Sequence, residues 1–480
     1  MRVTFDPTIT TWGRVFTDGG LEDLGAPLDG DSVGGQRIPE IARLQDDLRT
    51  SSGVPGFIAS LGEASLAVRQ ERRVTPINAE IGITNRLSLS FLVPIVRTET
   101  RASLKLSTAG ANLGPNPLAT VAGADQTYST FFSQFSAALT QLSDSVTGGH
   151  YGCPASPQCA QAEALLARGQ AVRDALERTI YGVGATGSPF IPRVGTDAGT
   201  GIDSTVSGIQ QQLASGYHVS GFNTTFLLAS DSLTEPTFES LLSDSSFGFG
   251  YYPLRTTSRY GLGDVELQAK YRVVTGRTYS AAVAGRVRLP TGTRDSTLEL
   301  FDVTIADHQT ALEGRLIQEL TLWGRLWLNL SIRAGTERLG TRARRVAPLD
   351  AFLVPYQATA VLNRMPGDYM AIDFAPMYKL APQFSIGLTA GYWTKGSDHY
   401  SFQSADDSVA LAGRLGVPVA ASVLDQGTSQ RWLRLGLAVT YVGPAVEGGF
   451  TVEQTVSGAG GMVPAATVFR LVFRISRKLF

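Results

Sequence analysis

Ala466-Thr-Val-Phe-Arg-Leu-Val-Phe-Arg-Ile-Ser-Arg-Lys-Leu-Phe480, the last stretch of the chain, decides the fold. Successive side chains of a strand point to opposite faces, so this stretch predicts one apolar and one polar face. The apolar face would hold Phe469, Leu471, Phe473 and Ile475. The polar face would hold Arg470, Arg474 and Ser476.

A final strand that closes on a C-terminal aromatic residue is typical of bacterial outer-membrane β-barrels. The apolar residues of such an ending usually keep the phase of the terminal Phe. Here Ser476 and Lys478 share the phase of Phe480. The sequence therefore predicts either a bulge near Ser476 or an imperfect end signal.

The composition also favours a membrane barrel. Hydrophobic residues make up 43% of the 480 residues and charged residues only 17%, below the roughly 25% of ordinary soluble domains. No run approaches the roughly 18 apolar residues of a membrane helix, and a barrel spreads its apolar residues over alternate positions. The net charge of −1 argues against nucleic acid as a partner.

The first residues, Met1-Arg-Val-Thr-Phe-Asp-Pro7, contain no charged-then-apolar signal segment. A barrel must be exported, so we expect that the signal is missing from this sequence or that its start is misassigned. Cys153 and Cys159 lie in a Pro-rich stretch without a second Cys pair or His to complete a zinc set. We expect a local disulfide, formed in an oxidising compartment; two unpaired buried cysteines are the alternative.

About twelve stretches have the length of a tilted membrane strand, roughly 9–11 residues, with alternating apolar and polar positions. The clearest are Val265–Val273, Leu326–Ala334, Leu87–Ile95, Tyr279–Leu289, Phe384–Tyr392 and Leu433–Tyr441. Weaker candidates are Ala64–Glu71, Ile77–Ile83, Leu312–Leu322, Met370–Leu380 and Val446–Thr455. The C-terminal strand completes the set.

The connections separate a barrel from a soluble sandwich, which alternation alone would also allow. Short turns follow every second strand, at residues 84–86, 275–277, 323–325, 381–383 and 443–444. Long segments separate the other pairs, at 106–260, 290–310, 340–367, 400–430 and 457–466. The first hairpin, with a tight turn predicted near Arg72-Arg73, is the exception. Short periplasmic turns and long outer loops are typical of outer-membrane barrels.

Aromatic residues near the strand ends predict interfacial girdles, since amphipathic rings favour the membrane surface. Ordinary core aromatics are the alternative. The residues concerned are Tyr271, Tyr279, Trp323, Trp327, Tyr378, Phe384, Tyr392, Trp393, Trp432, Tyr441 and Phe480.

Two regions do not read as barrel. Residues 1–56 are expected to form an N-terminal periplasmic or plug segment with a short helix, in which Ile41, Leu44 and Leu48 have helical spacing. Residues 107–260 are expected to form a helical extracellular insertion, with helices over Tyr128–Val146, Gln158–Tyr181, Ile202–Tyr217 and Leu233–Leu242. Barrel strands would then occupy 57–106 and 261–480.

Two stretches resemble a known family. They are Thr75-Pro-Ile-Asn-Ala-Glu-Ile-Gly-Ile-Thr-Asn-Arg-Leu-Ser-Leu89 with Val93-Pro-Ile-Val96, and Tyr260-Gly-Leu-Gly-Asp-Val-Glu-Leu-Gln-Ala-Lys-Tyr271 with Arg288-Leu-Pro-Thr-Gly-Thr-Arg294. They are similar to barrels of the meta-pathway phenol-degradation family, which loosely resembles the outer-membrane long-chain fatty-acid transporter. The resemblance covers roughly 60–105 and 260–480 and leaves out 107–260. It implies uptake of small hydrophobic or aromatic compounds.

The predicted inner face of the barrel is rich in charge. The lumen-lining candidates are Asp264, Glu266, Lys270, Arg272, Arg286, Arg288, Glu313, Arg315, Arg333, Asp373, Arg434, Arg470 and Arg474, with Arg69, Glu71 and Glu80 on the first strands. Ion pairs that stiffen and partly plug the barrel are one interpretation, and a polar lining that selects solutes is another. The cationic excess would modestly favour anionic solutes. Gly261, Gly263 and Asp264 are read as structural.

The sequence predicts no enzyme, metal site or cofactor. The four histidines fall in predicted loops or in the insertion, and His399 in Gly396-Ser-Asp-His-Tyr400 is the best catalytic candidate, but no nucleophile motif accompanies it. Asp29-Gly-Asp31 lacks the rest of a calcium loop.

We therefore expect an antiparallel transmembrane barrel of about twelve strands in the outer membrane. The expected function is diffusive uptake of a small hydrophobic or aromatic solute by a monomer surrounded by lipid. The alternative is a structural or interaction protein, in which the barrel anchors a helical surface domain that binds an envelope or cell-surface partner.

Overall fold

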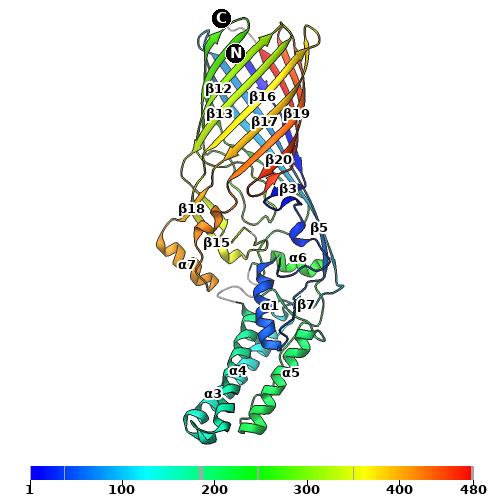
Figure 1. The fold of residues 1–480 in the computed structure, drawn as a ribbon, viewed down its shortest axis with the longest axis vertical. Coiled ribbons are helices and arrows are strands. Elements are labelled where there is room, and N and C mark those ends of the chain that lie inside the picture. Colours follow the sequence, from blue (N-terminus) through cyan, green and yellow to red (C-terminus); the bar gives the residue numbers. More distant parts are fainter. Residues whose placement is uncertain (1, 37, 183–187, 246–247, 350, 477–480) are drawn as a thin grey trace.

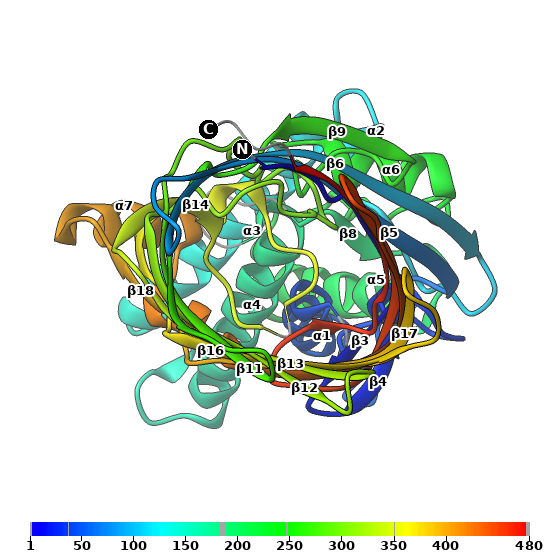
Figure 2. The same cartoon turned by 90° about the horizontal axis from the view of Figure 1, so that it is seen from above.

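The computed structural model describes residues 2–36, 38–182, 188–245, 248–349 and 351–476. It consists of a closed β-barrel at one end and a long, largely helical region at the other (Figure 1). Figure 2, which looks along the barrel, shows the ring of strands with segments of chain crossing its interior. Among the described residues, no helix is long and apolar enough to cross a membrane.

Antiparallel pairing closes the barrel through twelve wall positions within the described residues. Around the ring the order is β5, β6, β10, β11, β12, β13, β16, β17, β19, β20, β22 and then β1 with β2, which return to β5. The bounds are β5 Glu63–Gly82, β6 Leu87–Ser107, β10 Glu266–Thr275, β11 Tyr279–Arg288, β12 Ala311–Leu322, β13 Leu326–Glu337, β16 Tyr369–Lys379, β17 Phe384–Lys395, β19 Gln430–Val442, β20 Val446–Ala459 and β22 Thr467–Ser476. The predicted fold class is confirmed.

The N-terminus supplies one of these twelve positions, which the sequence interpretation did not foresee. β1 (Arg2–Phe5) and β2 (Thr8–Trp12) lie end to end between β5 and β22, and each pairs with both. Pro7 lies in the break between them, as expected for a residue that cannot donate to a strand ladder. The predicted plug segment is therefore wrong for its first residues, because they form barrel wall.

The predicted tight turn at Arg72-Arg73 is also wrong. β5 runs unbroken through both residues and pairs with β6 from Glu63↔Ser107 to Gly82↔Ser88. The two strand candidates 64–71 and 77–83 are thus a single long strand. The barrel therefore has one strand fewer than predicted here and one more at the N-terminus. The number of wall strands still equals the prediction.

The two ends of the barrel differ. The turn end carries the short connections 83–86, 276–278, 323–325, 380–383 and 443–445, together with β1 and the end of β22. The loop end carries every long connection. The terminal residues 477–480, including the predicted Phe480 end signal, lie outside the described residues. Over Thr467–Ile475 the pairing of β22 is regular, without a bulge.

A helical domain extends from the loop end. Its elements are α1 Pro39–Ser52, β7 Leu113–Pro115, α2 Pro117–Thr120, α3 Ala124–Thr147, α4 Pro157–Tyr181, β8 Phe190–Pro192, α5 Asp197–Gln211 and α6 Glu235–Ser243. All four helices predicted in the insertion are present. Apolar side chains such as Tyr128, Phe131 and Phe135 are fully buried in its core, and the predicted disulfide joins Cys153 to Cys159 between α3 and α4.

The helix predicted in the N-terminal segment belongs to this domain. α1 packs against α4 and α5, and its Ile41 and Leu48 are completely buried. Arg178 of α4 donates to Asp47 of α1 at 2.7 Å. The helix therefore does not dock at the turn end. β1 and β2 run along the barrel wall from the turn end to the loop end before the helix begins (Figure 1).

Smaller elements complete the loop end. A three-stranded sheet combines β14 Gly340–Arg345, β15 Thr359–Met365 and β18 His399–Phe402, with α7 Ala405–Leu415 beside it. A second sheet combines β3 Arg14–Thr17, β4 Gly20–Asp23 and β21 Val463–Pro464. β9, Thr257–Leu262, extends along β6 beyond the end of β10. The single-turn helices are Ala26–Leu28, His150–Gly152, Gln212–Gly216, Tyr356–Ala358 and Ala421–Asp425.

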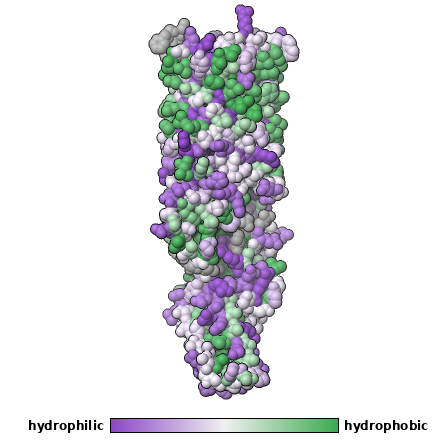
Figure 3. Space-filling view, turned by 60° about the vertical axis from the view of Figure 1, so that its left-hand side comes forward, coloured by the Kyte–Doolittle hydropathy of each residue, from purple (hydrophilic) through white to green (hydrophobic). Residues whose placement is uncertain are grey.

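The outer face of the barrel is apolar (Figure 3). Exposed large side chains recur at alternate wall positions, as lipid contact requires. They include Phe91, Leu267, Val283, Phe374, Leu388, Leu437, Phe450 and Phe473. This band and the closed barrel place the protein in the outer membrane.

Part of the predicted aromatic girdle faces outward. Tyr378, Phe384, Tyr392 and the turn residue Trp323 are exposed on the outside. Trp393 and Trp432 instead line the lumen, and Trp327 shares the inward phase of Asn329. Alternation puts neighbouring residues on opposite faces, so Tyr392 and Trp393 cannot both face lipid.

Candidate functional site

The inward faces of the strands bring most of the predicted lumen residues into ion pairs. Arg286 of β11 bridges Glu266 at 2.7 Å and Glu313 at 2.6 Å. Glu313, whose side chain is only 2% exposed, also accepts from Arg315 at 2.9 Å and from the Tyr369 hydroxyl at 2.6 Å. These groups span four wall strands and form a continuous charged belt.

A second group ties the lumen to the segment between β11 and β12, residues 289–310, called the inner loop below. Arg288 pairs with Asp307 of this loop at 2.7 Å and also with Glu337. Asp264, which is 5% exposed, accepts from the backbone N–H groups of Gly292 and His308 at 2.9 and 3.0 Å. Asp264 therefore holds the two ends of the inner loop together, a structural role.

The other candidates pair locally. Lys270 contacts Glu80 at 2.7 Å, and Arg333 contacts Asp373 at 3.5 Å. The guanidinium of Arg434 lies 4.1 Å from the centre of the Trp432 ring. Arg470 pairs with Asp6, and Arg474 pairs with Glu447. The last candidate, Arg272, is exposed near the turn end.

Two of the charged residues predicted for the lumen do not face it. Arg69 and Glu71 alternate with Gln70 and Arg72, and those two side chains reach the inner loop. Arg69 and Glu71 therefore point outward. The prediction failed because it divided β5 at Arg72-Arg73 and so assigned its two halves different phases.

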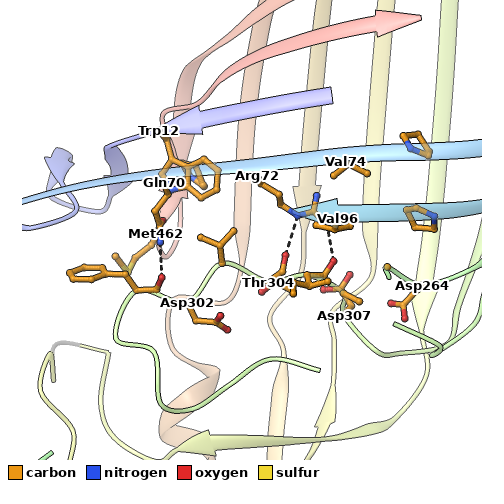
Figure 4. A pocket seen from close by; sticks show the side chains of 18 of the residues that line it. Trp12, Gln70, Arg72, Val74, Val96, Asp264, Asp302, Thr304, Asp307 and Met462 are labelled. Atoms are coloured by element: carbon orange, nitrogen blue, oxygen red, sulfur yellow. Dashed lines mark hydrogen bonds between the residues drawn. The ribbon is translucent and has the colours of Figure 1, made fainter. Parts of the chain in front are cut away.

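The inner loop is the main functional element that sequence reasoning missed. Arg72 donates to the carbonyls of Thr304 and Ile305 at 3.0 and 3.2 Å, and Gln70 donates to that of Phe301 at 2.9 Å (Figure 4). From the side of β9, Arg259 pairs with Asp302 at 2.8 Å. Burial raises the pKa of Asp302 to about 6, against the opposing effect of Arg259.

The inner loop divides the interior into two cavities. The wall cavity, about 780 Å³, lies between the loop and strands β5 and β6. Its lining is largely apolar, with Trp12, Val74, Pro76, Leu92, Pro94, Val96, Phe301, Val303, Ile305 and Met462 among its residues. Figure 4 shows side chains of the loop facing those of the wall. Charged residues also line the cavity: Arg72, Asp264, Glu266, Arg288, Asp302 and Asp307.

The mouth cavity, about 1440 Å³, lies on the other side of the loop. It is bordered by charged residues from several strands, including Arg286, Arg333, Arg342 and Asp398. Trp393 and Trp432 also line it, with nearly parallel rings 5.9 Å apart. Such aromatic side chains can contact the face of a flat solute.

Candidates for catalysis and metal binding do not assemble in the described part of the chain. His399 is 73% exposed and lies 3.3 Å from Asp425, whereas His308 binds a backbone carbonyl of the inner loop. Among the residues with described positions, no group of three or more His, Cys, Asp or Glu side chains could hold a metal ion.

Three outer-membrane proteins of known structure align with most of the chain, each with a TM-score below 0.5. An outer membrane channel from Pseudomonas putida F1 gives a TM-score of 0.39 at 8% identity and covers 98% of this chain and 94% of its own. The Ralstonia pickettii toluene transporter TbuX gives 0.35 at 8% identity, covering 99% and 90%. The P. putida toluene transporter TodX gives 0.29 at 9% identity, covering 100% and 90%. No curated protein matches the chain.

A family model matches residues 145–417. The match includes most of the helical insertion, which the resemblance drawn from short stretches had left out, and it ends before the last barrel strands. It spans more than half of the chain, so the protein belongs to the family described as "Putative MetA-pathway of phenol degradation".

Proposed function

We propose that the protein is a channel for diffusive uptake of a small, largely apolar solute, with an aromatic compound as the favoured class. The observation that carries this proposal is the wall cavity. It is a pocket of about 780 Å³ between the barrel wall and the inner loop, lined mainly by apolar residues with several charged ones among them. Ligand sites of about 300–1,000 Å³ with a few polar groups at the edge are typical of small-molecule binding.

The orientation follows from the two barrel ends. Outer-membrane barrels have short periplasmic turns and long extracellular loops. The turn end therefore faces the periplasm, and the loop end with the helical domain faces outward. A solute would then meet the mouth cavity first and the wall cavity beyond the inner loop.

The charged belt supports rigidity more than selection by charge. Arg286, Glu266 and Glu313 satisfy one another within hydrogen-bonding distance, and Arg288 is occupied by Asp307 and Glu337. Paired charges offer little net attraction to an ion in the lumen. A neutral solute fits this lining better than the anion suggested by counting arginines.

The proposed transport involves no catalytic step and requires no cofactor. The alternative, a barrel that only anchors a helical domain for an envelope partner, is supported by the length and dense packing of that domain. The apolar cavity inside the barrel favours transport instead, because an anchor needs no such pocket.

Titration of the detergent-purified protein with toluene tests the proposal. Val303 is 5% exposed and lines the wall cavity, so Val303→Trp fills it and should weaken toluene binding at least tenfold. Val121→Trp, at a 46% exposed site outside both cavities, is the matched control and should bind as the wild type does. Absence of toluene binding by the wild type, or equal binding by Val303→Trp, would contradict the proposal.

Conductance in planar bilayers tests the role assigned to the inner loop. Replacing residues 294–305 by a short Gly-Ser linker removes the segment that separates the two cavities and should raise single-channel conductance. Unchanged conductance in a folded variant would mean that the constriction lies elsewhere.

A further inference from the structure

The outer surface of β5 and β6 carries a ladder of charged pairs, called the arginine ladder below. Its three rungs are directly opposed cross-strand pairs: Arg73 with Arg97, Glu71 with Glu99, and Arg69 with Arg101. Like charges directly opposite each other destabilise a sheet, so this arrangement needs an explanation. Four arginines against two glutamates leave an excess of two positive charges.

Alternation fixes the ladder on the outside of the barrel. The residues between its rungs, Gln70 and Thr100, both bond the inner-loop carbonyl of Phe301 inside the lumen. The ladder residues lie on the other face. Their guanidinium groups reach solvent: the side chains of Arg73, Arg97 and Arg101 are 45%, 39% and 63% exposed.

The ladder begins where the lipid-facing band ends. On the same face towards the turn end lie exposed apolar residues, among them Ile77 and Phe91. Along the first rung, Arg73 pairs with Ile9 on one side, and Arg97 pairs with Tyr260 on the other. Tyr260 is 72% exposed, as expected for an interfacial aromatic residue. The first arginine pair therefore lies at the level of the lipid headgroups.

The glutamates of the ladder fix the positions of the arginines but accept only some of the guanidinium N–H groups. Glu99 is 11% exposed and accepts from Arg101 at 2.6 Å and from Arg97 at 3.1 Å. Glu71 holds Arg73 in the same way. A guanidinium has five N–H donors, so each retains several for another acceptor. Arg69 is exposed and has no ion-pair partner among the described residues.

We propose that the arginine ladder binds phosphate groups of lipid headgroups in the leaflet at the loop end. Guanidinium groups suit phosphate because they bind two of its oxygens at once. The two arginine pairs are four residues apart along the strand, about 13 Å, so they can serve two phosphates of one large headgroup. With the orientation proposed above, this leaflet is the outer one, whose lipid A carries two phosphates.

Binding of diphosphoryl lipid A to the folded, detergent-purified full chain tests the proposal. The variants are Arg73→Gln with Arg97→Gln, and Arg69→Gln with Arg101→Gln. Each pair should weaken binding about 25-fold, because an arginine near an anionic surface contributes roughly a factor of five. The matched control removes two arginines from α4 of the helical domain, Arg168→Gln with Arg173→Gln, and should leave binding unchanged.

Further arms keep the test decisive. Lipid A without its phosphates should bind the wild type more weakly than phosphorylated lipid A binds either variant, because it loses both phosphate contacts. Arg73→Lys with Arg97→Lys, which keeps the charge, should give an intermediate affinity. Equal affinity of the wild type for both lipids, or of wild type and glutamine variants for lipid A, would overturn the proposal. Displacement of lipid A by millimolar inorganic phosphate would show that free phosphate, and not a lipid headgroup, is the ligand, and would overturn the proposal.

Discussion

Leu437→Arg should destabilise the barrel strongly, because Leu437 lies in the middle of a lipid-facing row. Its side chain is 65% exposed, and the neighbouring wall positions on both sides are apolar, Leu388 and Val452. The outward residues of β19 run from Leu433 to Tyr441, about 26 Å along the strand. Leu437 is therefore near the bilayer midplane, where arginine costs about 2–4 kcal/mol.

Asn329→Arg is the matched inward substitution. Asn329 lies directly opposite Glu319, so a new guanidinium would face water and a carboxylate and should cost less than about 1 kcal/mol. Leu437→Ala measures the loss of the leucine alone. Urea titration in lipid vesicles, with the folded fraction read from heat-modifiable gel mobility, gives the free energies of unfolding. Equal losses for the two arginine variants would refute the assignment of the faces.

Three further predictions concern single features. Burial raises the pKa of Asp302 to about 6, so ionising this carboxyl as the pH rises costs folding free energy. Asp302→Asn should therefore stabilise the protein by about 1–3 kcal/mol above pH 6 in urea unfolding and by little below pH 4. A difference that stays constant with pH would contradict this. Replacing both cysteines by serine should cost about 2 kcal/mol, felt locally at the α3–α4 junction by hydrogen exchange, and unreduced denatured wild type should show no free thiol. Deleting residues 2–12 should abolish the heat-modifiable folded form, whereas a folded barrel after deletion would mean that β5 and β22 can pair without them.

Features set by local periodicity could be predicted from the sequence. The apolar row of β22, the helical stripe of α4 and the inward phase of Arg286 and Glu313 follow from spacings of two or 3.6 residues. These patterns need no knowledge of distant partners. The disulfide was equally local, since Cys159 lies six positions after Cys153.

Two errors in the barrel wall lie where the strand pattern of the sequence is interrupted. Val3, Phe5 and Ile9 lie in the same alternating phase in β1 and β2. Pro7 interrupts this pattern, so the sequence did not predict a strand there. The turn predicted at Arg72-Arg73 was a second error, because β5 continues through both residues and its Pro76 pairs directly with Pro94 of β6. The barrel tolerates both interruptions because neighbouring strands on each side hold the chain in register, and a single sequence does not show those neighbours.

The inner loop supplies acidic partners that a count of strand residues leaves out. Counting strand residues gave a cationic excess, since the arginines project from the wall in a regular phase. Two of their partners come from elsewhere: Asp307 from the inner loop, and Asp6 from the break between β1 and β2. These acids have no periodic pattern, so only the folded chain reveals the pairing. Once paired, these arginines are bound by acids of the same chain. The space beside the loop has both apolar and charged lining residues. This pairing supports the proposed neutral solute over the anion that a count of arginines suggests.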